Sequence, residues 1–141
     1  MELTVPLPNV PTLGQIQALE ALLAPMPQVE IPVEHLFADG MYARKITIPA
    51  GTVLTGKVHR TDHINVMLSG DIEVWTEQGM KRLVGPQVFV AKAGTKRVGR
   101  TFADTVWITF HASKETDLLA LEAELIEPEI PAIEGVTLWL G

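Results

Sequence analysis

Cysteine is absent from the 141-residue chain. Without thiols the protein has no disulfides, no thiolate metal ligands and no cysteine nucleophile. Long apolar runs are also missing, since no stretch reaches the roughly 18 residues that a membrane-spanning helix needs. The first residues, MELTVPLPNV, lack a basic region followed by an apolar stretch, so we expect no signal peptide and a cytoplasmic location.

Positive charge is scarce outside the middle of the chain. Residues 44–100 hold ten of the eleven Lys and Arg residues and only four of the 17 acids. The chain as a whole has a net charge of −6, which argues against nonspecific nucleic-acid binding. The uneven distribution predicts acidic arms that pack on a basic centre, their own or that of a neighbouring subunit. An ordinary solvated surface is the alternative.

Short apolar segments separated by turn residues fill the chain from Tyr42 to Ala112. They are ARKITI, TVLTGKV, INVML, IEVWT, MKRLV, QVFVA and TVWITF. Many short strands with no helix between them are typical of an antiparallel sandwich or barrel. The length of the chain suits a single domain with one core.

Helices are predicted only on either side of these strands. Thr12 can cap a helix that ends near Ala24, and a second helix is expected from about Thr116 to Ile126. We therefore divide the single domain into three parts. Residues 1–40 form an arm, a helix and a proline-rich wrapping segment, residues 41–112 form the barrel, and residues 113–141 form a helix and an extended tail.

Two histidines four residues apart, His59 and His63, lie in the segment GTVLTGKVHRTDHINVMLSG. A tight turn at RTD would place the rings opposite each other on two strands, whereas a single strand would place them on one face. Neutral imidazole binds divalent metals such as Zn, Fe, Ni or Mn, but a catalytic zinc site normally has three protein ligands. His111, at the end of the last predicted strand, is the third candidate. The alternative is a set of polar lining residues without metal.

The same segment resembles the first sequence motif of the cupin family. Counting back from Gly70, His63 stands where the family has a glutamate, and His59 and Lys57 stand at its two histidines. KAGTKR at 92–97 keeps the frame of the second motif, with Arg97 at the position of its histidine.

This resemblance covers about residues 41–111. It implies an all-β fold, a single cupin-type antiparallel jelly-roll barrel, with an N-terminal helix, a C-terminal helix and extended terminal arms. Only His59 keeps the family's metal ligand. The resemblance is also the only reason to bring His35 toward the barrel mouth.

Three stretches also look like small cupin-like proteins encoded by tailed bacteriophages. They are HLFADGMYARKITIPAGTVLTGKVHR, VGPQVFVAKAGTKRVG and DTVWITFHAS. This resemblance implies a source and a fold more than a reaction. It would add the virion and the host cytoplasm to the expected locations.

The first of three functional hypotheses is a binding or structural module with a histidine-lined barrel mouth. It would be a homo-oligomeric component of a phage-type, virion-associated assembly. Its terminal arms would contact other copies or other assembly proteins, with no membrane partner. The anchors would be the apolar residues of the tail, Leu138, Trp139 and Leu140.

The other two hypotheses are chemical. A metal-dependent cupin enzyme of the oxygenase or isomerase type would use His59, His63 and His111. A metal-free binder of anions or sugars would use Arg97 and Lys57, with Glu73 as a further ligand-binding residue. The incomplete ligand set favours a role without catalysis, although the sequence leaves open whether the protein is an enzyme.

Overall fold

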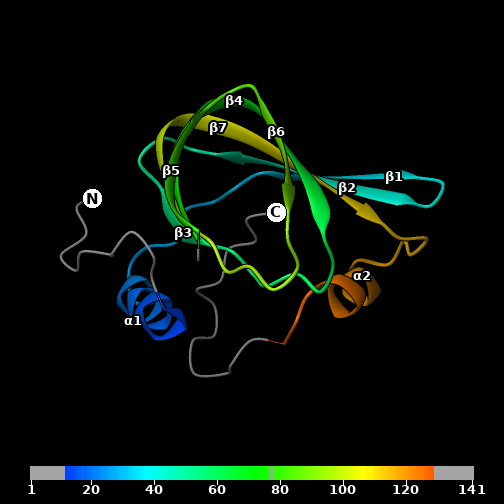
Figure 1. Ribbon diagram of the computed structural model, residues 1–141, viewed down its shortest axis with the longest axis horizontal. Helices are drawn as coiled ribbons and strands as arrows, with labels where there is room; N and C mark the ends of the chain where they lie inside the picture. Colours follow the sequence, from blue (N-terminus) through cyan, green and yellow to red (C-terminus); the bar gives the residue numbers. More distant parts are fainter. Residues whose placement is uncertain (1–11, 77, 129–141) are drawn as a thin grey trace.

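Seven antiparallel strands with a helix on either side make up the described residues, 12–76 and 78–128, in this computed structural model (Figure 1). The elements follow in the order α1 (Leu13–Leu23), β1 (Val33–Ala38), β2 (Met41–Ile48), β3 (Val53–Thr55), β4 (His63–Thr76), β5 (Gly79–Val84), β6 (Gln87–Ala91), β7 (Val98–Ala112) and α2 (Leu118–Leu125). This arrangement confirms the predicted all-β fold with two flanking helices. Neither helix has the length and apolar character needed to cross a membrane.

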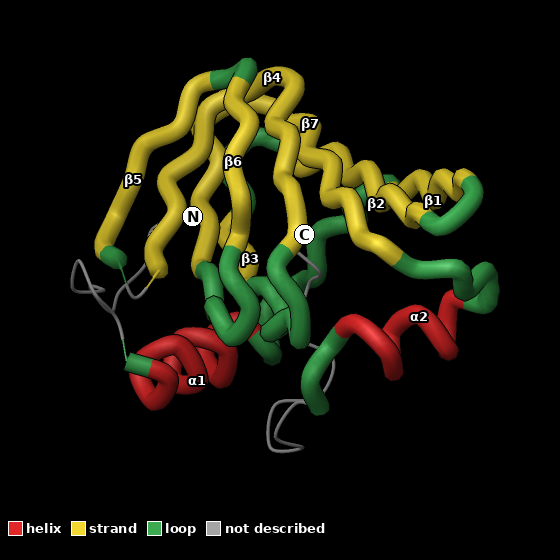
Figure 2. Tube along the Cα trace, turned by 45° about the vertical axis from the view of Figure 1, so that its right-hand side comes forward, coloured by secondary structure: helices red, strands yellow, loops and turns green. Residues whose placement is uncertain are grey.

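The two longest strands, β4 and β7, bend the sheet into a barrel. They pair with each other along their length, and each also pairs with two different partners. The first half of β4 pairs with β6 and the second half with β5. The first half of β7 pairs with β3 and the second half with β2. Two half-sheets result, β1-β2-β7-β4-β6 and β3-β7-β4-β5, which enclose the core (Figure 2).

The bend in β4 lies at Gly70, where the sequence had suggested a turn between two separate strands. The structure instead shows one strand with register shifts between Met67 and Ile72. Gly70 has φ 115, and a Cβ atom there would lie 2.5 Å from the Cα atom of Thr105 on β7. Only glycine fits this close approach, so a residue that resembled a turn signal serves as a bulge inside a strand.

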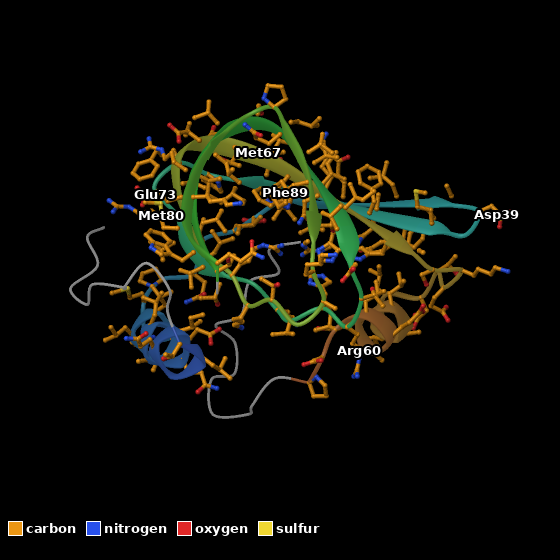
Figure 3. The ribbon with its side chains drawn as sticks, viewed as in Figure 1. Asp39, Arg60, Met67, Glu73, Met80 and Phe89 are labelled. Carbon is orange, nitrogen blue, oxygen red and sulfur yellow. The ribbon has the colours of Figure 1, made fainter. Side chains whose placement is uncertain are left out.

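The interior of the barrel is filled by side chains that alternate along the strands. The core residues are Ile46, Ile48, Leu54, Met67, Ile72, Val74 and Trp107. Met67 and Phe89 lie inside the barrel in Figure 3, and the ring of Phe89 meets Trp107 edge to face. Burial of these side chains provides the main stabilisation of the fold.

The first helix closes one end of the barrel. Thr12 and Gln15 form a capping box at its start, as the predicted N-cap required. Leu19 and its apolar neighbours pack against Val98. On the same face, the buried Glu20 carboxylate accepts a hydrogen bond from Thr55 Oγ (2.7 Å) and lies 3.4 Å from Lys96 Nζ.

Strand β1 lies in the segment for which the sequence predicted only a wrapping connection. The three prolines between residues 25 and 32 had indicated an irregular connection rather than a strand. The overlooked signal was Asp39-Gly40, because a two-residue loop of this type joins β-hairpin strands. Ala38 pairs with Met41 across it, and Gly40 has φ 74. The β1–β2 hairpin projects away from the barrel in both views, with Asp39 at its tip (Figures 1–3).

The predicted anchors in the tail, Leu138, Trp139 and Leu140, lie outside the described residues.

Candidate metal centre

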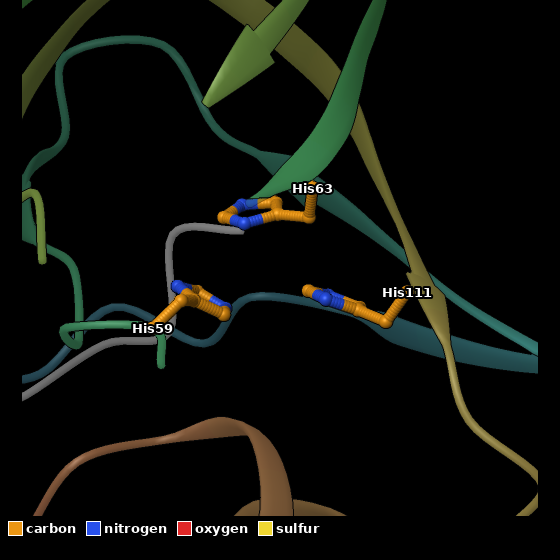
Figure 4. Close-up of side chains that lie close together, drawn as sticks. All are labelled: His59, His63 and His111. Atoms are coloured by element: carbon orange, nitrogen blue, oxygen red, sulfur yellow. The ribbon is translucent and has the colours of Figure 1, made fainter. Parts of the chain in front are cut away.

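Three buried histidines, His59, His63 and His111, meet at one end of the barrel (Figure 4). Their candidate ligand atoms all lie within 4.8 Å of one another. The ring centroids of His59 and His63 are 4.2 Å apart, those of His63 and His111 4.8 Å, and those of His59 and His111 5.2 Å. The structure thus brings together the three histidines that the sequence had singled out.

The register of β4 and β7 places His63 beside His111. Ile64 pairs with Phe110, so His63 and His111 are the next pair along the same two strands, and both side chains point inward. Each histidine is held by a nearby oxygen. His63 Nδ1 lies 3.3 Å from the Thr61 carbonyl, and His111 Nε2 lies 3.1 Å from Thr109 Oγ1.

His59 reaches the centre from a loop, and neither arrangement suggested by the sequence is present. It lies between β3 and β4 and forms an isolated bridge with Ile126, just after α2. Arg60 N donates to the Leu125 carbonyl (2.7 Å), and Glu127 N donates to the Val58 carbonyl (2.9 Å). The end of the second helix therefore positions His59 through the backbone on both sides of it.

Tyr42 supports the centre from β2. Its buried ring stacks on His111 with centroids 5.9 Å apart and also packs against Leu121 and Leu125 of α2. His35 contacts the other side of this residue, with Nδ1 2.7 Å from the Tyr42 hydroxyl. His35 is exposed and does not belong to the group of three histidines. It contacts Tyr42 instead.

Burial keeps the imidazoles of His59 and His111 neutral. Loss of solvation, reinforced by His63, His111, Arg97 and Arg44, lowers the pKa of His59 to about 2. Burial, followed by the charges of His63 and Arg44, lowers the pKa of His111 to about 3. The Nδ1 atom of His111 is buried without a hydrogen-bond partner in the described part of the chain. The neutral His111 ring, with Nδ1 free of a protein hydrogen bond among the described residues, is the kind of donor that a divalent metal requires.

The three residues proposed for anion binding do not share one site. Arg97 is buried and borders a cavity of about 270 Å³, which Gln87 and Phe89 also line. Lys57 instead forms an ion pair with Glu122 of α2 and lines a different groove. Glu73 lies 4.0 Å from Arg82, far along the other half-sheet. Of the three, only Arg97 borders the barrel cavity.

Asn65 and Thr109 line the barrel next to the histidines and were not predicted. Asn65 Oδ1 accepts a hydrogen bond from Trp107 Nε1 (3.1 Å), whereas its buried Nδ2 atom has no partner among the described residues. Asn65 lies two residues from His63 and Met67, and Thr109 lies two residues from His111 and Trp107. Strand periodicity applied to the polar residues could therefore have identified both.

No protein-family model matches the chain, and neither does any curated protein. Solved structures do match. Ectoine synthase from P. lautus superposes with a TM-score of 0.57 at 13% identity, over 81% of this chain and 86% of that one. KdgF from Halomonas sp. gives 0.51 at 22% identity, over 62% of this chain and 86% of that one. An RmlC-like cupin from Methanocaldococcus jannaschii, described as a double-stranded β-helix, gives 0.51 at 11% identity, over 63% of this chain and 85% of that one.

The chain has a cupin fold. The neighbours confirm the jelly-roll barrel that the sequence motifs implied, with a helix on either side of it. At such low identities the likeness concerns the fold, and a cupin fold carries many unrelated functions. Function must therefore be argued from the histidine centre itself.

Proposed function

We propose that this cupin domain binds one divalent first-row transition metal through His59, His63 and His111. The convergence of three buried imidazoles carries this proposal, since their candidate ligand atoms lie within 4.8 Å of one another. His111 Nδ1 is buried without a hydrogen-bond partner among the described residues, which costs free energy, and a bound metal ion would compensate that cost. Zn, Fe, Ni and Mn all accept imidazole nitrogen.

Three protein ligands leave an open position on the metal, which is typical of catalytic rather than structural sites. When bound, the ion would supply Lewis-acid chemistry to a small molecule with an oxygen donor. The chain itself does the positioning. Thr109 and Tyr42 hold the His111 ring, and the bridge to Ile126 holds His59. Arg97, on the wall of the neighbouring cavity, would orient an anionic group of that molecule.

This proposal takes up the metal site of the metal-dependent enzyme, one of the three hypotheses from the sequence. The structure supports it better than the metal-free binder, because Lys57 and Arg97 line different cavities. The virion-associated role rests on the resemblance to phage proteins and stays a prediction.

Metal titration of the full chain, prepared without a histidine tag and treated with chelator, tests the proposal. We expect one ion per chain by calorimetry, with Zn, Ni, Fe and Mn tried in turn. His63→Gln or His111→Gln should weaken the affinity by about a hundredfold or more, because each removes one of three ligands.

His35→Gln is the matched control. It removes a histidine that contacts Tyr42 but lies outside the group, so we expect less than about a tenfold change in affinity. Failure of the wild-type chain to bind any of the four metals would contradict the proposal. An equal loss in all three variants would also contradict it.

A further inference from the structure

Asn65, on β4, is a polar residue with an exposed fraction of 0% in the layer of side chains next to the histidine centre. Inward-facing residues recur at every second position of a strand, so His63, Asn65 and Met67 lie in successive layers of the barrel interior. The strand registers place Phe89 of β6 on one side of Asn65 and Thr109 of β7 on the other. Asn65 therefore faces the barrel interior directly beside the layer of His63.

One hydrogen bond fixes the orientation of the Asn65 amide. Its Oδ1 atom accepts from Trp107 Nε1 at 3.1 Å. The indole N–H can only donate, so the amide oxygen, and not the amide nitrogen, faces Trp107. Trp107 pairs with Met67 and therefore belongs to the layer farther from the histidines. The amino group, on the opposite side of the amide carbon, is turned away from that layer.

The amino group of Asn65 is a buried donor that the rest of the described chain does not use. Nδ2 carries two N–H bonds, and it has no hydrogen-bond partner among the described residues. A buried donor without an acceptor costs free energy, and an oxygen atom of a bound molecule would remove that cost. The amide cannot turn over without losing its bond to Trp107. The site is therefore built to receive an acceptor atom.

Two buried arginines lie near the same space. Arg44 of β2 pairs with Thr109 and so belongs to the layer of Asn65, whereas Arg97 borders the barrel cavity. Loss of solvation is the main cause of the low pKa of His59, and the charges of Arg97 and Arg44 lower this pKa further. Both guanidinium groups are thus close enough to the histidine centre to act on a molecule bound beside it.

Negative charge is scarce in the barrel interior. Among the described residues Glu20 is the only buried acid, and it lies at α1 beside Lys96. Glu122 of α2 acts on Arg44, but its side chain is 43% exposed and forms an ion pair with Lys57. A divalent metal would add two further positive charges. Because buried charge of one sign is costly, the site favours an anionic ligand.

We propose that Asn65 is a specificity-determining residue, which binds a carboxylate oxygen of the small molecule at the metal. This inference rests on the proposed metal site and names the class of its ligand. A carboxylate has two oxygens, so one can bind the metal while the other accepts a charge-assisted hydrogen bond from Asn65 Nδ2. An amine would leave Nδ2 without an acceptor and would meet like charges, so the site rejects it.

Titration of the full chain with acetate, at saturating zinc, tests the proposal. NMR spectra report the binding, and the indole N–H of Trp107 is the most informative signal because it is hydrogen-bonded to Asn65. Asn65→Leu nearly keeps the size of the side chain but removes the donor. We expect this variant to bind acetate about tenfold more weakly or worse, since a hydrogen bond to a charged group is lost.

Gln87→Met is the matched control. Gln87 borders the barrel cavity in the layer of Met67, and its amide donates to the Val84 carbonyl (3.0 Å). The variant makes the same change from amide to apolar group, and we expect acetate affinity to change by less than about threefold. Wild-type acetate affinity in Asn65→Leu, an equal loss in both variants, or no binding of acetate to the wild-type chain would each overturn the proposal.

If Asn65→Leu does not fold, the wild-type chain provides a second measurement. Acetate should shift the Trp107 indole signal, and methylammonium should leave it unchanged. A Trp107 signal that does not move at saturating acetate, or that moves equally with both probes, would contradict the proposal.

The metal-free chain separates this inference from the metal site on which it rests. Without metal, Asn65 Nδ2 and both arginines remain, so acetate should still bind, more weakly, and should lose affinity in Asn65→Leu. A wild-type chain that binds no zinc but shows this dependence on Asn65 would contradict the metal site and uphold the role of Asn65. A chain that binds zinc but shows no dependence on Asn65 would do the reverse.

Discussion

At the scale of single residues, the neutral histidines link stability to pH. The pKa of His59 is lowered to about 2 and that of His111 to about 3, whereas an unfolded histidine titrates near 6.5. Below pH 6.5 these two histidines are protonated in the unfolded chain but stay neutral in the folded chain. The contribution of these two histidines to the free energy of unfolding is therefore complete above pH 6.5. It is lost progressively as the pH falls toward 3.

We expect the free energy of unfolding of the metal-free protein to fall by about 2 kcal/mol for each of these two histidines between pH 7 and pH 5. Urea unfolding in chelator at several pH values measures this slope. His111→Gln should make the slope shallower, because glutamine does not titrate. Asp62 and Asp71 add nothing in this window, since hydrogen bonds lower their pKa below 3.8. A stability that does not change between pH 7 and pH 5 would refute the expectation.

At the scale of elements, the attachment of α1 depends on a buried ion pair. Glu20 and Lys96 are both buried, and their charged groups lie 3.4 Å apart, so removing the carboxylate takes away a close opposite charge from a buried ammonium. We expect Glu20→Leu to lower the free energy of unfolding by about 3 kcal/mol or more, and the double variant Glu20→Leu/Lys96→Met to recover much of that loss.

Urea unfolding of the single and double variants measures this coupling. Lys92→Met is the control, since it breaks an exposed ion pair with Asp62 and should change stability by less than about 1 kcal/mol. If the double variant is no more stable than Glu20→Leu, the pair does not act as described, and α1 is held by Leu19 and its apolar neighbours alone.

Local signals predicted most of the elements and distant contacts set the rest. The capping residue Thr12 marked the start of the first helix, because the hydrogen bonds of its capping box lie within one turn. The turn predicted at Gly70 was wrong. Glycine is required there because Thr105 of another strand approaches its Cα closely, and the local sequence does not show this. Strand β1 was missed, although Asp39-Gly40 carried the local signal for its hairpin.

Local signals also predicted only a part of the candidate site. Strand periodicity and position pointed to His63 and His111, which adjacent strands bring together. The place of His59 depends on Ile126, 67 residues further along, and no local pattern encodes such a bridge. The cupin frame drew attention to both Arg97 and Lys57. It could not predict the ion pair of Lys57 with Glu122, because Glu122 belongs to a helix outside that frame.

At the scale of the whole molecule, metal binding should stabilise the entire domain. A ligand that binds only the folded state adds about 2.7 kcal/mol at a hundred times its dissociation constant. We expect the melting temperature of the wild-type chain to rise with metal concentration, and that of His63→Gln to change little over the same range. Thermal melts of both proteins in matched buffers measure this. A similar rise in both would indicate metal bound elsewhere.

The contact between the second helix and the loop of His59 has a kinetic consequence. Helix α2 fixes His59 through the backbone and steadies His111 through Tyr42, so undocking of one short helix would loosen two donors at once. The opening rate of α2 would then set an upper limit on how fast a bound ion is exchanged. Occupancy would in turn slow the hydrogen exchange of the helix amides. Helix α2, which lies outside the barrel strands, would thus control the residence time of the metal.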